Sequence, residues 1–174
     1  ISFPSPNDRQ LHESLFPSGE SITHLRSDSI VERAASMKTR LALIIPTMDR
    51  GGAEKQLALL AINLPRDQFD VHVFLLTRDG PRSDDLRAAA IPVTVIGKRF
   101  KADPTALQRL TKELRQFSPH IAHTWLFAAN SFGRAAAIRA RVPVIIGSER
   151  CVDPWKSWWH FAIDRYLAKR SVAI

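Results

Sequence analysis

The chain of 174 residues contains a single cysteine, Cys151, so no disulfide can form within it. A disulfide-stabilised secreted mini-protein is therefore excluded, and we interpret Cys151 as structural. Long hydrophobic runs are also missing, because no stretch approaches the roughly 18 consecutive apolar residues of a membrane-spanning helix. Residues 1–4 lack the basic segment and the apolar run of a secretory signal. These absences favour a cytoplasmic protein.

Positive charge is plentiful but unevenly distributed. The chain has 25 Lys and Arg against 17 Asp and Glu, a net charge of +8. Residues 1–36 carry −2, contain several prolines and serines and show no apolar period, so we expect a polar, disordered tail there. The other 138 residues carry +10, which favours an anionic partner. Nucleic acid is not expected, because the sequence has no helix-turn-helix, zinc-finger or base-stacking motif.

From residue 38 onward, apolar strand patterns alternate with helix patterns. The spacing predicts strands at 41–45, 71–76, 93–96, 121–124 and 142–146, with Ser83 and Asp103 capping two of the intervening helices. This alternation predicts an α/β fold, a doubly wound, mostly parallel Rossmann-like sheet with strand order 3-2-1-4-5. A last helix from Asp153 to about Arg170 and a truncated sixth strand from Ser171 are expected to follow. We therefore interpret the chain as the front part of a longer protein.

The predicted topology indicates where a ligand would bind. In open parallel sheets, ligands bind beyond the carboxyl ends of the strands, at the point where the strand order reverses. For the order 3-2-1-4-5, this switch point lies between the first and fourth strands. The loops that qualify are residues 47–53, 123–125 and 147–152.

The first of these loops contains Arg50, Gly51 and Gly52 at the start of a helix. Paired glycines let the backbone approach a ligand, and the free amides of a helix start favour an anion such as phosphate. The loop is neither the G-x-G-x-x-G dinucleotide motif nor a P-loop. A tight turn without a ligand explains the same residues, and both interpretations stay open.

His123 ends the fourth strand, and Glu149 and Arg150 follow the fifth. The histidine suits a general base or a ligand for a phosphate or sugar hydroxyl, and the arginine suits a clamp for carboxylate or phosphate. The alternatives are a half-buried histidine bonded to a backbone carbonyl and an ion pair within the loop. No Cys cluster, H-x-x-x-H pair or paired carboxylates are present, so we expect no metal site.

The predicted last helix carries Trp155, Trp158 and Trp159 on one stripe, with Lys156 among its cations. Such a stripe is typical of a helix that packs on the sheet and exposes a basic face to solvent. The alternative is contact with an anionic membrane surface, which would make the protein peripheral at the inner membrane face.

Two segments carry a family resemblance. Gly51-Gly52-Ala53-Glu54-Lys55 after the first strand and residues 119–125 around His123 resemble the amino-terminal domain of family-4 glycosyltransferases, which have the two-domain GT-B fold. Residues 147–150 read Gly-Ser-Glu-Arg and precede the tryptophan-rich helix. This segment looks like the corresponding segment of bacterial members of the family. The resemblance covers residues 38–174.

The resemblance implies transfer of a sugar, hexosyltransferase-like, from a nucleotide-sugar donor to the hydroxyl of a glycan or lipid-linked acceptor. It implies retention of the anomeric configuration, no cofactor or metal, and a place in polysaccharide biosynthesis. Gly51 and Gly52 inherit a place near the donor diphosphate, and His123 a place beside the transferred sugar. Arg50, Glu149 and Arg150 line the acceptor side. The donor-binding domain of the family, with its Glu-x7-Glu segment, is absent from this sequence.

We therefore expect the acceptor-side half of a retaining glycosyltransferase, inactive without the missing carboxy-terminal domain. The alternative is a non-catalytic α/β module that binds an anionic ligand or a membrane surface at the same edge of the sheet.

Overall fold

A computed structural model describes residues 38–149 of the chain, which divides into two units between residues 37 and 38. The described part alternates strand and helix throughout. Its elements are β1 (Thr39–Ile45), α3 (Gly52–Asn63), β2 (Phe69–Leu75), α4 (Ser83–Ala88), β3 (Val93–Val95), α5 (Pro104–Phe117), β4 (Ile121–Trp125), α6 (Leu126–Ala140) and β5 (Val144–Ser148).

The strands form one parallel sheet in the order β3-β2-β1-β4-β5, which confirms the predicted topology. β1 lies between β2 and β4, with Leu43 in register with Val73 on one side and His123 on the other. The apolar run of β1 is buried because helices cover both faces of the sheet at this position.

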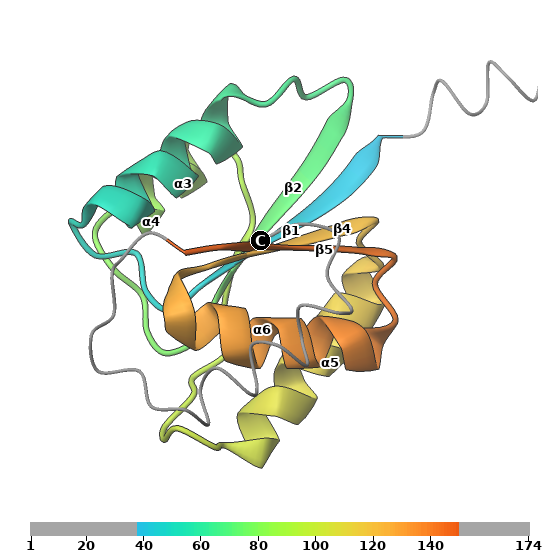
Figure 1. The fold of residues 1–174 in the computed structure, drawn as a ribbon. Coiled ribbons are helices and arrows are strands. Elements are labelled where there is room, and N and C mark those ends of the chain that lie inside the picture. Colours follow the sequence, from blue (N-terminus) through green and yellow to red (C-terminus); the bar gives the residue numbers. More distant parts are fainter. Residues whose placement is uncertain (1–37, 150–174) are drawn as a thin grey trace, which may run out of the picture. The chain divides into compact units, whose positions relative to one another are not determined.

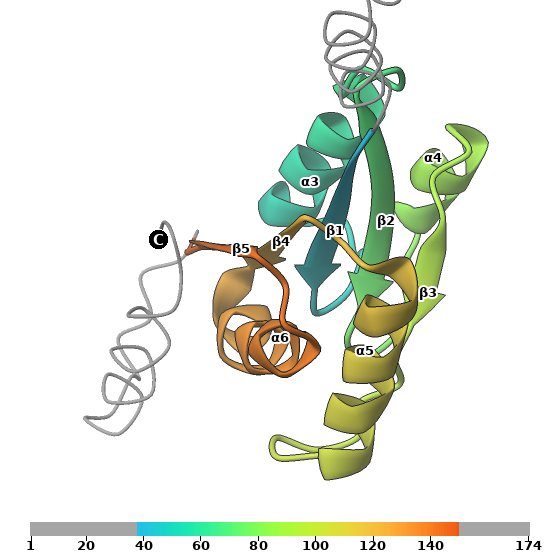
Figure 2. The same cartoon turned by 90° about the vertical axis from the view of Figure 1, so that its right-hand side faces the viewer.

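Helices pack on both faces of the sheet (Figures 1 and 2). α5 and α6 bury Leu110, Leu114 and a row of alanines against one face. α3 and α4 bury Leu57, Ala61 and Leu86 against the other face. The core therefore lies in two layers, one on each side of the sheet, and the strand ends remain at the sheet edges, where loops can form a site.

α5 begins as the sequence predicts. The Asp103 carboxylate accepts hydrogen bonds from the backbone amides of Thr105 and Ala106 at 3.1 and 3.0 Å, and Pro104 is the first helical residue. The Arg99 amide, the Thr105 hydroxyl and the Ala106 amide all donate to this carboxylate, and they hold the pKa of Asp103 far below its usual range. The cap is buried, so it fixes the point at which the β3–α5 loop turns into the helix.

Two local predictions were wrong. β5 covers residues 144–148 instead of 142–146, because the Val142 amide bonds to the Ala137 carbonyl and closes the end of α6. Ser83 is the first residue of α4 and not its cap. Arg82 stands at the cap position in helical conformation and makes no side-chain capping bond.

Several expectations fall on residues that the structure does not describe: the tail of residues 1–36, the helix from Asp153 to about Arg170, and the sixth strand from Ser171. Among the described helices, none is long and apolar enough to cross a membrane.

Candidate functional site

The switch point of the sheet lies where the sequence predicts it, between β1 and β4. Ile44 near the end of β1 is in register with Thr124 near the end of β4. β1 and β2 point to the same edge of the sheet (Figure 2). The loop of residues 46–51 leaves this edge toward α3, and β4 passes directly into α6. Two helix N-termini thus start beside the end of β1, and their free amides favour negative charge.

Gly51 caps α3 with extended backbone, and Gly52 is its first residue. A Cβ atom at Gly52 would meet no other atom within 4 Å, and the residue is exposed. At Gly51, a Cβ atom would collide with the carboxylate of Glu54, which folds back over the helix start. The open side of the helix terminus is therefore at Gly52, with the exposed Arg50 just before the glycine pair.

The loop before Gly51 is held by Arg78, from the loop after β2, and by Thr47, from the loop itself. The Arg78 guanidinium donates two hydrogen bonds to the Asp49 carboxylate, at 2.9 and 2.7 Å, and the Thr47 hydroxyl donates a third at 2.9 Å. The Thr47 and Arg78 bonds hold the pKa of Asp49 below its usual value. The negative charge of Asp49 is thereby compensated within the loop.

Gly80 brings the β2–α4 loop into direct contact with the same segment. A Cβ atom there would lie 2.4 Å from the backbone carbon and oxygen of Met48. The Met48 carbonyl also accepts a hydrogen bond from the Arg82 amide at 3.0 Å. The loop of residues 46–51 therefore lies against the backbone of the β2–α4 loop. Only glycine at position 80 allows the two backbones to approach so closely. Gly80 was not predicted from the sequence, because the contact joins segments about 30 residues apart.

His123 lies half-buried on β4, with its Nε2 atom 2.7 Å from the Ser148 hydroxyl on β5. Its ring contacts the Trp125 ring at a centroid distance of 4.8 Å. Trp125 in turn lies in a buried cluster with Met48, from the loop of residues 46–51, and Leu57, from α3. His123 is therefore connected through packed side chains to the loop that carries the glycines.

Behind His123, a buried set of hydrogen bonds fixes the end of β5. The Thr124 hydroxyl donates to Oδ1 of Asn130 at 2.7 Å, and Nδ2 of Asn130 donates to the Ser148 carbonyl at 3.1 Å. Arg134 donates from Nε to the Asn130 carbonyl at 2.5 Å. These bonds hold the backbone of Ser148, whose hydroxyl meets His123. None of the three polar side chains behind Ser148 was singled out from the sequence, because they read as ordinary strand and helix residues.

The turn from β4 to α6 places Leu126 in the left-handed region, with φ of 69°. A bulky residue rarely adopts this conformation, which costs on the order of 1 kcal/mol and is concentrated at functional turns. It allows α6 to start immediately after Trp125, so the amides of its first turn lie at the carboxyl edge of the sheet.

The remaining predicted residues are only partly described. Glu149 is exposed directly after β5. Arg150, Trp155, Lys156, Trp158 and Trp159 lie outside the described residues. Within residues 38–149, no group of three or more potential metal-ligating side chains occurs. The described edge of the sheet thus offers helix amides, the Arg50 cation, a histidine and hydroxyl groups, which suit an anionic or polyhydroxylated ligand.

Comparisons with known proteins agree with this description. The sequence model of glycosyltransferase family 4 matches residues 50–174. HepE from Anabaena, solved in complex with UDP, is 21% identical with a TM-score of 0.60, over 78% of this chain and 36% of that structure. UDP-GlcNAc 2-epimerase from Neisseria meningitidis, solved with UDP-GlcNAc bound, is 12% identical with a TM-score of 0.54, over 76% of this chain and 39% of that structure. No curated protein matches the sequence significantly. The chain spans little more than a third of either solved structure.

Proposed function

This chain belongs to glycosyltransferase family 4, and from that premise we propose that it forms the acceptor-side half of a retaining glycosyltransferase. The reaction moves a sugar from a nucleotide-sugar donor to the hydroxyl of a glycan or lipid-linked acceptor. Both structural neighbours were solved with UDP or a UDP-sugar bound, so UDP-sugars are the first donors to test.

The observation that carries the proposal is the environment of Gly52. The backbone there does not need glycine, because φ is not positive and a Cβ atom would have room. The first helical position, which Gly52 occupies, also gains nothing from glycine, because glycine is a poor helix former. The physical reason that remains for glycine at position 52 is that a ligand approaches the backbone there closely. The amides of the first turn of α3 would then bind the donor diphosphate.

His123 is proposed to lie beside the transferred sugar. Its ring is half-buried and held by Ser148 and Trp125, so it is pre-positioned to bond a sugar hydroxyl. Arg50, Glu149 and Arg150 would bind the acceptor. No described side chain is assigned as a nucleophile.

The proposal includes a second domain that completes the cleft. A GT-B cleft aligns donor and acceptor and excludes water between two domains, and half a cleft does neither. We expect the 174-residue chain alone to have no transferase activity, and the gene product that also carries a donor-binding domain to be active.

The test compares Gly52→Ala, Gly52→Val and His123→Ala in that gene product, with release of UDP from UDP-sugars as the readout. Gly52→Ala fits the fold, so its unfolding midpoint should match the wild type or exceed it while turnover falls. Gly52→Val and His123→Ala should suppress turnover about 100-fold, the size typical of a lost positioning or charge-stabilising contact.

The control is Gln56→Ala on the exposed face of α3, which should leave turnover unchanged. Full turnover in both Gly52→Val and His123→Ala would remove the assignment of these residues. A gene product that turns over no nucleotide sugar at all would remove the proposed function itself.

A further inference from the structure

The positive charge of the described residues is concentrated on one side of the sheet. Residues 97–142, which include α5 and α6, contain nine Lys and Arg but only two Asp and Glu. Residues 38–96, which include α3 and α4, contain eight against seven and are nearly neutral. Since α5 and α6 cover one face and α3 and α4 the other, one helix layer is strongly basic and the opposite layer is not.

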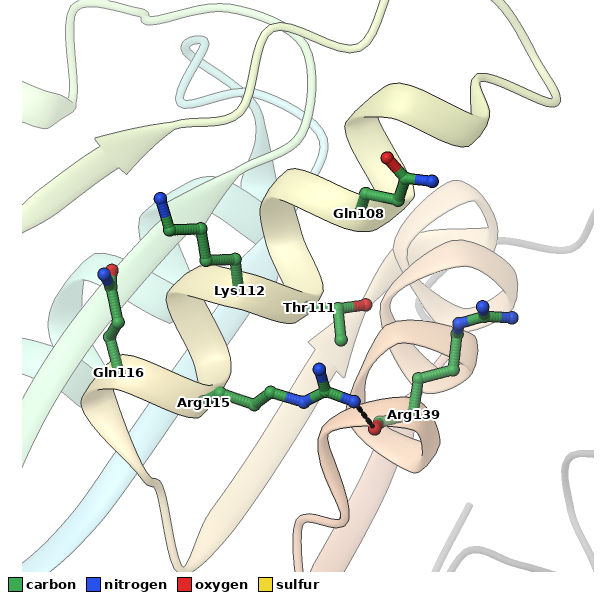
Figure 3. A pocket seen from close by; sticks show the side chains of 6 residues that line it. All are labelled: Gln108, Thr111, Lys112, Arg115, Gln116 and Arg139. Atoms are coloured by element: carbon green, nitrogen blue, oxygen red, sulfur yellow. Dashed lines mark hydrogen bonds between the residues drawn. The ribbon is translucent and has the colours of Figure 1, made fainter.

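A basic groove of about 430 Å³ runs between α5 and α6 (Figure 3). Its lining includes three cations and no carboxylate. The residues are Gln108, Thr111, Lys112, Arg115, Gln116 and Arg139. The Arg115 guanidinium donates to the Arg139 carbonyl at 2.9 Å, which joins the two helices. The groove therefore presents concentrated positive charge on an exposed surface, without an acidic side chain in its lining to neutralise it.

The loop before α5, residues 97–103, adds an apolar group to this layer; we call it the cationic loop. Phe100 is 59% exposed, more than the other exposed large hydrophobic side chains of the described part. Lys98, Arg99 and Lys101 are its neighbours in the sequence. An aromatic ring that stays in water between cations needs an explanation, because folding normally buries such rings.

The cationic loop is anchored and does not collapse onto the core. The Lys98 amide donates to the Leu76 carbonyl at 2.7 Å, and the Arg99 amide donates to the Asp103 carboxylate at 3.0 Å. The Lys98 ammonium lies 5.2 Å from the centre of the Phe132 ring on α6. Arg109 on α5 donates to the carbonyls of Ile96 and Gly97 at 3.0 and 3.1 Å. These bonds fix the base of the loop against both helices of the basic layer and leave Phe100 exposed.

We propose that the cationic loop and the basic α5–α6 layer form a docking surface for an anionic lipid bilayer. A bilayer interface offers both things that this surface matches: negatively charged headgroups for the cations and an apolar phase for the Phe100 ring. A soluble polyanion would match the charge but would leave the exposed ring without an apolar environment. The loop follows β3 at the carboxyl edge of the sheet, so docking would bring the candidate site close to lipid headgroups. The proposal does not depend on the sugar-transfer reaction.

The test is co-sedimentation of the full 174-residue chain with vesicles. Vesicles made of equal parts phosphatidylglycerol and phosphatidylcholine should bind the chain, and phosphatidylcholine alone should bind it at least tenfold less. The double variant Arg99→Glu/Lys101→Glu should lower binding to the anionic vesicles by tenfold or more, since each cation near the surface contributes several-fold to affinity. Phe100→Ser should lower it about fivefold to tenfold.

The matched controls lie on the nearly neutral layer. Leu59→Ser removes a side chain that is 50% exposed on α3, and Lys55→Glu/Arg66→Glu reverses the same number of charges. Both should leave vesicle binding within about twofold of the wild type. All variants change exposed residues, and thermal unfolding confirms that each is folded.

Three results would overturn the proposal. One is equal binding to neutral and anionic vesicles. Another is vesicle binding that Phe100→Ser and the charge-reversed loop leave unchanged. The third is loss of binding to a fluorescent single-stranded oligonucleotide in the loop variants with vesicle binding intact, which would assign the surface to nucleic acid instead.

Discussion

At the scale of single residues, two glycines near the switch point have opposite environments. Gly52 has open space around the position of a Cβ atom, whereas Gly80 lies against the backbone of Met48. One glycine is therefore not required by the fold, and the other is. The sequence alone does not reveal this difference, because the space around each glycine depends on segments distant in the chain.

The pair gives a direct prediction. Gly80→Ala should lower the free energy of unfolding by about 1–3 kcal/mol, because the added methyl group must displace the loop backbone at Met48. Gly52→Ala should leave it unchanged or raise it by up to about 0.5 kcal/mol. Urea denaturation of the two variants checks this, and equal stabilities would show that the β2–α4 loop yields to a methyl group without cost.

Ser148 gives a second prediction at this scale. Its hydroxyl meets Nε2 of His123, so we expect it to position the ring for the proposed reaction. In the active gene product, Ser148→Ala should lower kcat about tenfold and leave the donor KM within twofold, the effect of one lost hydrogen bond. Ser148→Thr retains the hydroxyl and should restore most of kcat. A loss that Ser148→Thr shares would point to packing at β5 instead.

At the scale of elements, α5 depends on one buried side chain. Asp103 accepts bonds from Thr105, Ala106 and the Arg99 amide, so it holds both the helix start and the cationic loop. Asp103→Ala should cost about 1–2 kcal/mol of stability, as for other lost N-caps. The exposed Asp67→Ala serves as control and should cost less than about 0.5 kcal/mol.

The Asp103 effect should also depend on pH. The folded chain holds the pKa of this carboxyl below its unfolded value of about 3.9, so its stabilisation is present above that pH. It is lost as the pH falls toward the depressed pKa. The stability difference between wild type and Asp103→Ala should therefore shrink in acid, as followed by urea titrations at successive pH values. A constant difference at all pH values would mean that the charged carboxylate is not what stabilises the cap.

The elements themselves were largely predictable because their signals are local. Apolar runs mark β1 and β2, and Asp103-Pro104 marks the start of α5. The errors arose where tertiary bonds decide. Val142 reads as a strand residue, but the left-handed backbone at Arg141 turns its amide back to the carbonyl of Ala137.

At the scale of the whole molecule, the predicted strand order is confirmed, and it puts the switch point between β1 and β4. Parallel connectivity alone brings the ends of β1 and β4 to one edge. The sequence could not supply two contacts between distant segments, Gly80 against Met48 and Asn130 behind Ser148. It also could not supply the strained turn at Leu126. Each joins or bends parts of the chain whose local pattern carries no sign of the partner.

The stability of the whole domain should also respond to His72. This ring stacks on Phe74 at 4.3 Å, meets Phe117 at its edge and bonds Thr94 through Nε2. Burial lowers its pKa, although Asp70 opposes the shift. The unfolded chain takes up this proton near pH 6.5 and the folded chain resists it, so stability falls as the pH drops below about 6.5.

His72→Phe removes the titrating group and keeps an aromatic ring in place. Between about pH 7 and pH 5, its free energy of unfolding should fall less steeply than that of the wild type. Urea denaturation across this range measures both slopes. Parallel slopes would indicate that the buried ring takes up its proton as readily as in the unfolded chain.

The strand order has one more consequence, for self-association. β3 forms one edge of the described sheet and is only three residues long, with Pro92 directly before it. A short edge strand beside a proline exposes few free amides and carbonyls, so it offers a poor template for a strand of another copy. We infer that this edge is protected from amyloid-like growth, even though Val95 remains 43% exposed on it.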